Sequence, residues 1–258
     1  MARPYLSIII PAYNEADRLP KTLLDIDKRL AGAAYSYEIL VVNDGSKDNT
    51  EEVAKKMAKM IKNLKVVGMP ENGGKGATVK QGMLLAAGAI KLFTDADNAT
   101  SIDQFEKMMP YFKEGADVVI GSRATAGATL DPPEAWYRQV VGKALNVLVQ
   151  LLLLPGIWDT QCGFKAFTDA AAQRIFAASR ITTWGFDVEV LSLARKMGYA
   201  TQQVPVHWVN DPNSTVHFSA GLQFLRDIIT IRWWLWRDEY PIDTAVADPS
   251  DRDMPKNK

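Results

Sequence analysis

The chain of 258 residues has a single cysteine, Cys162, and only two histidines, His207 and His217. One cysteine excludes an intramolecular disulfide, and two histidines leave little material for a zinc site. We therefore expect a protein of a reducing, cytosolic setting rather than a disulfide-stabilised or zinc-centred one.

Net charge and long apolar runs are lacking too. Thirty Lys and Arg residues balance thirty Asp and Glu residues, so no global field attracts nucleic acid and any anion site must be local. No apolar run reaches the roughly 18 residues of a membrane span, and the run at 6–10 is too short for a signal peptide. Since 47% of the residues are hydrophobic, we expect a sizeable core in a protein that is soluble or lies on a membrane surface.

Two familiar nucleotide-binding motifs are missing. The glycine loop at 72–76 continues into Ala77, whereas a Walker A loop ends in Gly-Lys-Ser or Gly-Lys-Thr, and this difference excludes a P-loop ATPase. No G-x-G-x-x-G follows the first apolar run, which argues against a dinucleotide-dependent dehydrogenase.

The sequence does contain a regular alternation of β-branched runs and helical patterns. Strands are predicted at 6–10, 38–42, 64–67 and 90–94, and helices at 15–30, 48–61 and 75–87. Three successive β-α units predict a mostly parallel sheet with right-handed crossovers, so the loops after the four strands share one sheet edge. The predicted fold class is α/β, with helices flanking the sheet.

The second half continues this pattern less regularly. Further strands are predicted at 116–120 and 204–209, with helices at 169–178 and 186–197. Residues 158–165 mix polar and aromatic types without periodicity and are interpreted as a functional loop. The polar, proline-containing segment 241–258 is expected to be disordered.

Asp95 and Asp97 form the candidate metal site. Asp-x-Asp occurs three times, at 25–27, 95–97 and 251–253, but only the middle pair follows a predicted strand. In an open α/β sheet, ligands bind beyond the carboxyl ends of the strands, and Mg²⁺ is usually held by one or two carboxylates plus substrate phosphates. The pair therefore lies where a cation with a phosphorylated ligand is expected.

Other polar loops at the same edge suit a nucleotide diphosphate. Tyr13 can lie against a base, Asp44 can accept the imide hydrogen of uracil or guanine, and Lys75 stands at a helix start where it can contact phosphate or ribose. Arg123 follows the fifth strand and is a candidate clamp for a second anion. Residues 43–45 are equally an ordinary turn signal and Lys75 equally a solvated side chain, so both interpretations stay open.

Two apolar stretches are candidates for membrane contact. Residues 144–154 are almost wholly apolar and follow basic residues, and they fit either a buried core helix or a membrane-attached one. In 218–240, apolar residues recur at helical spacing beside arginines, and Trp233, Trp234 and Trp236 suit a headgroup layer. The competing interpretation docks these rings into the domain; we favour the membrane interface.

Seven strings in order along the chain carry a family resemblance: IIPAYNE, VVNDGSKDNT, NGGKGATVKQG, FTDADNAT, VIGSR, WDTQCGFKAF and WGFDVEVL. Through them, the chain from residue 7 to about 236 resembles the inverting family 2 glycosyltransferases of GT-A fold. It more closely resembles the branch of the dolichyl-phosphate β-glucosyltransferases and polyprenyl-phosphate sugar transferases. The resemblance implies a Rossmann-like GT-A domain, which we assign to 1–212. The residue pattern described above adds an amphipathic membrane-interface helix at 213–240 and the tail at 241–258.

The resemblance also implies roles for individual residues. The implied donor contacts are Pro11, Tyr13, Asn14, Glu15, Asp44, Lys75, Asp95 and Ala96. Asp97, with Asp95, is implied as the ligand of Mg²⁺ or Mn²⁺. Arg123 and Arg138 match positions that hold the lipid phosphate, and we add Lys143 as a third candidate for this contact.

Asp159 matches the acidic residue that is often assigned as the base in this family. With Asp97 and Arg123 it makes up the predicted catalytic set. A phosphate monoester has a second pKa of about 6 and is largely ionised at neutral pH, so it hardly needs deprotonating. Asp159 can therefore position the sugar or the acceptor rather than remove a proton.

The predicted activity is metal-dependent, inverting transfer of a hexose to a polyprenyl phosphate of dolichyl type. Glucose from UDP-glucose is the expected donor, and a peripheral position on the cytoplasmic face of a membrane is the expected location. The alternatives are GDP-mannose or another nucleotide sugar, a soluble or polysaccharide acceptor, and a non-catalytic nucleotide-sugar-binding protein. One departure from the family pattern is that Ser214-Thr215 follows Trp208 where relatives commonly carry Ser-Lys, so one expected cation is missing.

Overall fold

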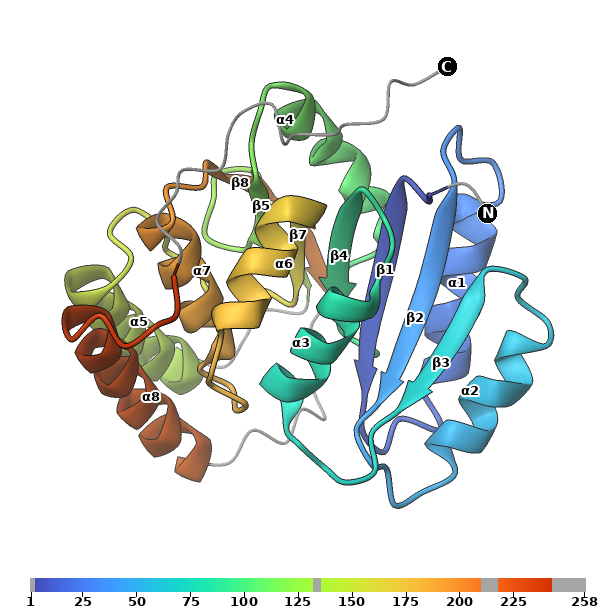
Figure 1. Ribbon diagram of the computed structural model, residues 1–258, viewed down its shortest axis with the longest axis horizontal. Helices are drawn as coiled ribbons and strands as arrows, with labels where there is room; N and C mark the ends of the chain where they lie inside the picture. Colours follow the sequence, from blue (N-terminus) through green and yellow to red (C-terminus); the bar gives the residue numbers. More distant parts are fainter. Residues whose placement is uncertain (1–2, 132–135, 210–217, 243–258) are drawn as a thin grey trace.

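Figure 1 shows the computed structural model of the protein, which describes residues 3–131, 136–209 and 218–242, without the side chains of 136–141, 143 and 218–220. The strands are β1 (Leu6–Ala12), β2 (Tyr37–Asn43), β3 (Leu64–Gly68), β4 (Ile90–Thr94), β5 (Val118–Ser122), β6 (Thr129–Asp131), β7 (Phe164–Thr168), β8 (Thr201–Pro205) and β9 (His207–Val209). The helices are α1 (Leu19–Leu30), α2 (Thr50–Ala58), α3 (Lys75–Leu85), the 3-10 helix η1 (Ile102–Lys107), α4 (Met109–Lys113), α5 (Trp136–Leu152), α6 (Asp169–Ala178), α7 (Phe186–Lys196) and α8 (Phe218–Trp236).

A seven-stranded sheet in the order β3-β2-β1-β4-β7-β5-β8 runs through the molecule, and β6 pairs with β9 in a small second sheet. β1 is parallel to β2 and β4, β2 is parallel to β3, and β5 is parallel to β8. The carboxyl ends of β1 to β5 therefore lie at one edge, toward the bottom of Figure 1. The predicted α/β class and the predicted shared edge are confirmed.

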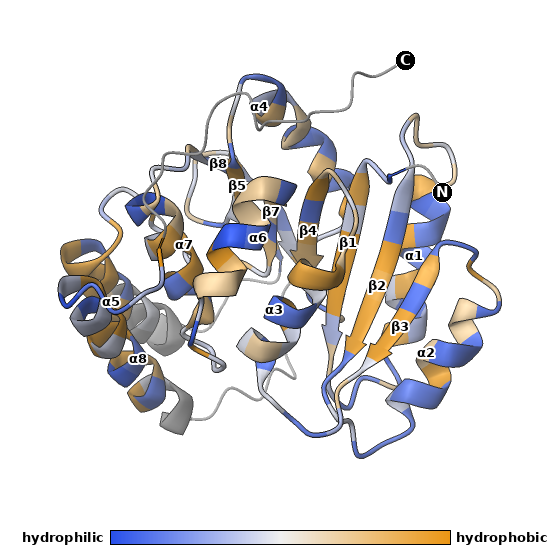
Figure 2. Ribbon diagram, viewed as in Figure 1, coloured by the Kyte–Doolittle hydropathy of each residue, from blue (hydrophilic) through white to orange (hydrophobic). Residues whose placement is uncertain are grey.

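Helices cover both faces of the sheet and close two apolar layers. α1, α2, η1 and α4 pack on one face, and α3, α5, α6, α7 and α8 pack on the other. β1 and β2, near the centre of the sheet, are hydrophobic over most of their length (Figure 2), as expected for strands that are buried on both sides. This packing fixes the strand ends, so the loops of the functional edge start from rigid positions.

β7 corrects the interpretation of residues 158–165 as a loop, because a strand begins at Phe164 within this segment. It runs antiparallel between β4 and β5, pairing Lys165 with Phe93 on one side and with Ile120 on the other. The five-residue run FKAFT has a lysine at its second position, which hides the apolar pattern of a buried strand. The loop proper is therefore shorter than predicted, and its end is tied to the centre of the sheet.

The predicted strand at 204–209 is in fact two strands. β8 ends at Pro205, and β9 begins at His207 and leaves the main sheet to pair with β6. Proline lacks a backbone N–H and so interrupts a ladder, which explains the break. The predicted helix at 144–154 is the second half of the longer α5.

The ammonium group of Lys165 lies buried in the middle of the sheet. It donates hydrogen bonds to the Asp187 carboxylate on α7 and, over 2.7 Å, to the Cys162 carbonyl oxygen. Its Nζ lies 5.2 Å from the ring centroid of Phe93. Burial raises the pKa of Asp187 despite the opposing charge of Lys165. The pair joins three elements: β7, the segment before it and the start of α7.

Replacing Asp187 by leucine should destabilise the fold by about 3–5 kcal/mol, because the buried Lys165 would lose its partner. The double variant Lys165→Met, Asp187→Leu should recover part of that loss, since two apolar side chains then replace the pair. Urea unfolding followed by far-ultraviolet circular dichroism measures both variants. A double variant no more stable than Asp187→Leu would contradict this account of the pair.

Candidate active site

The loops after β1 and β2 dock on each other and form one surface. Asn14 adopts a left-handed conformation with φ of 56°, and its side-chain oxygen accepts a hydrogen bond from the Lys47 N–H over 2.9 Å. The backbone N–H of Asn14 donates to Ser46 Oγ, and that of Glu15 donates to Thr50 Oγ1. Asparagine tolerates this backbone conformation better than most residues. Asn14 and Glu15, two predicted donor residues, are thus held in place by the β2–α2 loop.

Asp44, after β2, ties this surface to the glycine loop. Its two carboxylate oxygens accept hydrogen bonds from the N–H groups of Gly73 and Gly74 over 2.7 and 3.1 Å. The residue is almost fully buried. A carboxylate has about four acceptor positions, so Asp44 can still accept the imide hydrogen of a base. Among the other predicted donor residues, Pro11 lies on β1, and Tyr13 is exposed just beyond it.

The turn that carries Asp95 and Asp97 is fastened to α1. The hydroxyl of Thr22 donates to the Ala96 carbonyl oxygen over 2.6 Å, and Ala96 itself is buried. One Asp97 oxygen accepts the N–H of Ala99 over 3.0 Å. Asn98 has a φ of 57° and lets the chain turn back at this point. The carboxylate pair is therefore positioned by a helix as well as by β4.

Lys75, the first residue of α3, reaches into this site. Its Nζ lies 2.7 Å from Asp95 Oδ1 and 5.0 Å from the ring centroid of Trp184. Burial alone would lower the pKa of Lys75, but the charges of Asp95 and Asp187 outweigh burial, and the pKa is raised. The interpretation of Lys75 as a solvated side chain is wrong.

Negative charge is crowded around Asp97. Burial raises the pKa of Asp97, and the neighbouring Asp95 raises it further. Burial likewise raises the pKa of Glu15, with smaller contributions from Asp97 and Asp95. Crowded carboxylates of this kind are stabilised by a cation.

The donor set suits a hard divalent cation that shares its coordination with a substrate. Among the residues that the structure describes, no three histidine, cysteine, aspartate or glutamate side chains are grouped to hold a metal ion. Asp95 and Asp97 provide carboxylate oxygens, and the diphosphate of a nucleotide would complete the shell, as is usual for Mg²⁺. The residues present therefore fit a metal bound together with its substrate.

Gly163, the residue before β7, makes room for Asp95. Thr94 and Phe164 are register partners, so antiparallel pairing brings Gly163 opposite Asp95. A Cβ atom at Gly163 would lie 1.9 Å from Asp95 Oδ2. Gly163 lies within the family string WDTQCGFKAF but is not among the predicted site residues. Gly163 is needed because only a residue without a side chain leaves space for the carboxylate.

Asp159 and Arg123 form a closely bonded pair at the far side of β7. The Arg123 backbone N–H and Nε donate to one Asp159 oxygen over 2.7 and 2.8 Å, and Nη2 donates to the other over 2.8 Å. The guanidinium carbon lies 4.7 Å from the ring centroid of Trp208. Burial alone would raise the pKa of Asp159, but the hydrogen bonds and charge of Arg123 outweigh it and lower the pKa. A carboxylate held in this way is a weak base, which favours a positioning role.

The two sides of the site meet at the segment between Asp159 and Gly163. Burial raises the pKa of the Cys162 thiol to about 12, and the charges of Asp159 and Asp95 both add to the shift. Cys162 therefore lies within electrostatic reach of both carboxylates, next to the Lys165 ammonium that holds its carbonyl oxygen. The predicted site residues do not include Lys165, Asp187 or Trp184, although each falls within one of the strings that carry the family resemblance.

Several predicted residues lie outside the described part of the structure. The backbone of α5 carries Arg138 and Lys143, but their side chains are not among the described ones. Ser214, Thr215 and the tail from residue 243 onward lie outside it as well.

α8 presents two different faces. Trp233 and Trp236 are 49% and 69% exposed and contact each other edge to face, with Leu222 and Ile229 exposed on the same helix. Trp234 instead packs against Tyr240. Successive helical residues point about 100° apart, so neighbouring tryptophans cannot share one face. Trp234 therefore lies on a different face of α8 from Trp233 and Trp236, the other two tryptophans of the predicted membrane contact.

The exposed apolar face of α8 (Leu222, Ile229, Trp233 and Trp236) continues onto α5. Leu151 is 77% exposed there, and Leu152 lines a shallow groove together with Ile229, Arg232, Trp233 and Trp236. α5 and α8 lie side by side at the left of Figure 1, and apolar and polar stretches alternate on both in Figure 2. In the described part of the chain, no helix has the length and apolar character needed to cross a membrane.

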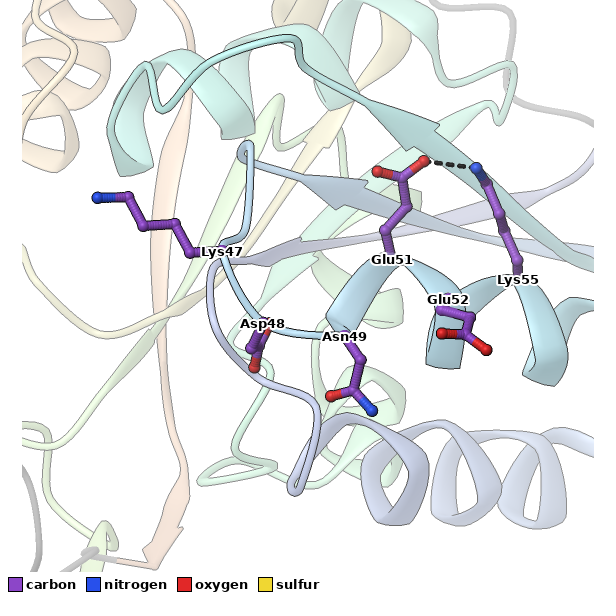
Figure 3. A pocket seen from close by; sticks show the side chains of 6 residues that line it. All are labelled: Lys47, Asp48, Asn49, Glu51, Glu52 and Lys55. Carbon is purple, nitrogen blue, oxygen red and sulfur yellow. Dashed lines mark hydrogen bonds and ion pairs between the residues drawn. The ribbon is translucent and has the colours of Figure 1, made fainter.

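A separate surface hollow lies at the start of α2. Figure 3 shows its lining: Lys47, Asp48, Asn49, Glu51, Glu52 and Lys55. Glu51 and Lys55 form an ion pair with each other along the helix. Asp48 caps this end of α2 by accepting the Thr50 N–H over 3.0 Å. Glu51, Glu52, Lys55 and Asp48 already have partners, so the hollow has the character of a solvated helix start.

Substitution Gly163→Ala should reduce turnover roughly 10²-fold or more, because displacing a reacting group by about 1 Å can cost that much. Mn²⁺ affinity, measured by electron paramagnetic resonance, should fall in parallel since Asp95 is displaced. Gly32→Ala is the matched control, because a Cβ at Gly32 would have no neighbour within 4 Å. Unchanged Mn²⁺ binding in Gly163→Ala would refute the role given to this glycine.

Comparison with known proteins agrees with this geometry. Residues 7–176 match the glycosyl transferase family 2 profile. The dolichyl-phosphate beta-glucosyltransferase of Dictyostelium discoideum is 37% identical over 242 residues, covering 89% of this chain and 74% of that protein. The human dolichyl-phosphate beta-glucosyltransferase is 34% identical over 242 residues, covering 88% and 74%.

Solved structures share the fold at low sequence identity. Mannosyl-3-phosphoglycerate synthase from Rubrobacter xylanophilus superposes with a TM-score of 0.66 at 18% identity, covering 92% of this chain and 75% of that one. Glucosyl-3-phosphoglycerate synthase from Mycobacterium tuberculosis, in complex with Mn²⁺, UDP-glucose and phosphoglyceric acid, has a TM-score of 0.66 at 17% identity, covering 89% and 80%. With the profile match and the relatives above, the conclusion is that the chain belongs to glycosyl transferase family 2, with a GT-A-like fold.

Proposed function

We propose that this glycosyltransferase moves glucose from UDP-glucose to a dolichyl-type polyprenyl phosphate and inverts the anomeric centre. The observation that carries the proposal is the meeting of two charged sites across β7. Asp95, Asp97 and Lys75 lie on one side, and the Arg123–Asp159 pair lies on the other. The names of relatives that are 34–37% identical support the choice of sugar and acceptor.

On the donor side, the chain binds and orients a nucleotide diphosphate. The exposed ring of Tyr13 can lie against the base, and the spare acceptor positions of Asp44 can take the imide hydrogen. Asp97 and Asp95 would hold Mg²⁺ or Mn²⁺, which would supply positive charge to the leaving UDP as a Lewis acid. Lys75, which contacts Asp95, adds a second cation beside the diphosphate. The use of a divalent metal with UDP-glucose is supported by the M. tuberculosis enzyme, a protein of the same fold that was solved with Mn²⁺ and UDP-glucose.

On the acceptor side, the chain holds a phosphate that is already a nucleophile. The acceptor phosphate is largely ionised at neutral pH, so its oxygen can attack without a base. Arg123 provides the charge that attracts it. Asp159 fixes the guanidinium through two hydrogen bonds and accepts a third from the Arg123 backbone N–H. The phosphate oxygen bonds to the anomeric carbon as the bond to the UDP oxygen breaks. Attack from the opposite side converts an α-linked donor into a β-linked product.

The acceptor lipid is reached at a membrane surface, with α5 and α8 as the contact. The exposed apolar face of α8 places tryptophans beside arginines, and the Arg237 guanidinium carbon lies 5.3 Å from the Trp233 ring centroid. Aromatic rings suit the headgroup layer, and arginines attract anionic headgroups. We place the protein peripherally on the cytoplasmic face of the membrane.

Purified protein with Mn²⁺ and a short polyprenyl phosphate should produce a hexosyl-phospholipid from UDP-glucose when offered a panel of nucleotide sugars. Mass spectrometry identifies the product, and nuclear magnetic resonance gives its anomeric configuration. Asp97→Ala should lose metal-dependent transfer, whereas Asp253→Ala, in another Asp-x-Asp, should retain it.

Other outcomes of this assay would overturn specific parts of the proposal. Transfer from a GDP-sugar alone would replace the donor, and transfer to soluble sugars alone would replace the acceptor. UDP-glucose binding without transfer or hydrolysis would indicate a binding protein.

The double variant Trp233→Ser, Trp236→Ser should bind vesicles of phosphatidylcholine and phosphatidylserine roughly tenfold more weakly or worse, because two large apolar side chains are lost from the contact. Sedimentation of protein with vesicles measures the change. Met60→Ser is the matched control, since Met60 is 73% exposed but lies just beyond α2. Equal binding of the parent and the double variant would refute this membrane face.

A further inference from the structure

Residues 180–185, here called the bridging loop, connect α6 to α7 and lie between the glycine loop and α8. The N–H of Gly76 donates to the Thr182 carbonyl oxygen over 2.8 Å. A Cβ atom at Gly74 would lie 2.5 Å from Thr182 O, and one at Gly76 would lie 2.5 Å from Ile181 O. The glycine loop and the bridging loop therefore touch backbone to backbone, and one cannot shift without the other.

The bridging loop also carries the aromatic ring next to Lys75. Lys75 Nζ lies 5.0 Å from the ring centroid of Trp184, on the same ammonium group that contacts Asp95. Trp184 is 48% exposed, so its ring borders the site rather than the core. The position of the bridging loop thus sets the start of α3 and the surroundings of the Lys75 ammonium.

On its other side, the bridging loop is held by Asp227 of α8. The Thr183 hydroxyl donates to Asp227 Oδ2 over 2.6 Å, and the Gly185 N–H is also bonded to this carboxylate. A Cβ at Gly185 would lie 2.4 Å from Asp227 Cβ, so the two elements are in close contact. Asp227 is buried on the face of α8 opposite to the exposed tryptophans.

The C-terminal segment holds the first residues of the bridging loop as well. The N–H groups of Arg180 and Ile181 donate to the Glu189 carboxylate over 2.9 Å, and the Tyr240 hydroxyl donates to the same carboxylate over 2.8 Å. The Arg180 guanidinium carbon lies 4.1 Å from the Trp234 ring centroid. Trp234, which packs against Arg180 and Tyr240, therefore helps to hold the bridging loop in place.

We propose that Asp227 is a positioning residue of the donor site, which acts through Thr183 and the bridging loop on Lys75 and the glycine loop. The inference rests on the proposed function, because it assumes that the nucleotide diphosphate binds beside Lys75. Through this connection, α8 serves two purposes. One face contacts the membrane, and the opposite face sets the affinity for the donor.

Isothermal titration of the full chain with UDP and Mn²⁺ tests the proposal. Thr183→Val, which keeps the shape but removes the hydroxyl, should weaken UDP binding roughly three- to tenfold, the loss expected for one hydrogen bond. Thr183→Ser keeps a hydroxyl and should restore the affinity. Gln223→Ala, at an exposed position four residues before Asp227 on α8, is the matched control and should bind UDP like the parent.

Kinetics separate positioning from a general structural defect. Thr183→Val should raise the KM for UDP-glucose and leave the KM for polyprenyl phosphate unchanged. In a double-mutant cycle, the effects of Asp227→Ala and Thr183→Val should be less than additive, because both remove the Thr183–Asp227 hydrogen bond. Unchanged UDP affinity in Thr183→Val, no restoration by Thr183→Ser, or an equal rise in both KM values would overturn the inference alone. Failure of the parent to bind UDP would overturn the proposed function and this inference together.

Discussion

The insertion of β7 between β4 and β5 is the constraint on which the rest of the site depends. Antiparallel pairing reverses the chain direction at this one position, so the segment that enters β7 arrives at the edge where β4 and β5 end. Gly163 is thereby placed against Asp95, and Asp159 is placed within reach of Arg123. An all-parallel sheet would carry this segment to the opposite edge. One reversed strand therefore brings the donor side and the acceptor side together.

That arrangement concentrates carboxylates, and each is stabilised in a different way. Lys75 contacts Asp95, Arg123 contacts Asp159, and Lys165 contacts Asp187. Burial and the neighbouring Asp95 carboxylate raise the pKa of Asp97, so Asp97 gains from an added cation. Ion pairs within the chain therefore stabilise Asp95, Asp159 and Asp187. Excess negative charge remains near Asp97, where the metal and the donor are expected.

Sequence patterns predict those parts of the fold that local chemistry determines. The first four strands are recognisable because buried parallel strands are continuous apolar runs, and their shared edge follows from right-handed crossovers. The position of Asp95 and Asp97 could be predicted for the same reason. β7 could not, since its apolar run is interrupted by Lys165, and the partner that permits this lysine, Asp187, is 22 residues away in sequence. The space that Gly163 leaves for Asp95 likewise exists only once the strands are paired.

α8 is a second element whose placement the sequence pattern does not determine. Its apolar residues predict an amphipathic helix, but a pattern cannot tell which of two apolar faces meets the domain. The structure turns Phe224, Ile228 and Ile231 inward and leaves Trp233 and Trp236 outside. A helix that is apolar on both faces suits a second apolar environment on its outer side. Asp227 lies on the inward face of α8, where it contacts the bridging loop. The helix with the proposed membrane face is thus bonded to the loop that borders the proposed donor site, so both proposals involve one element.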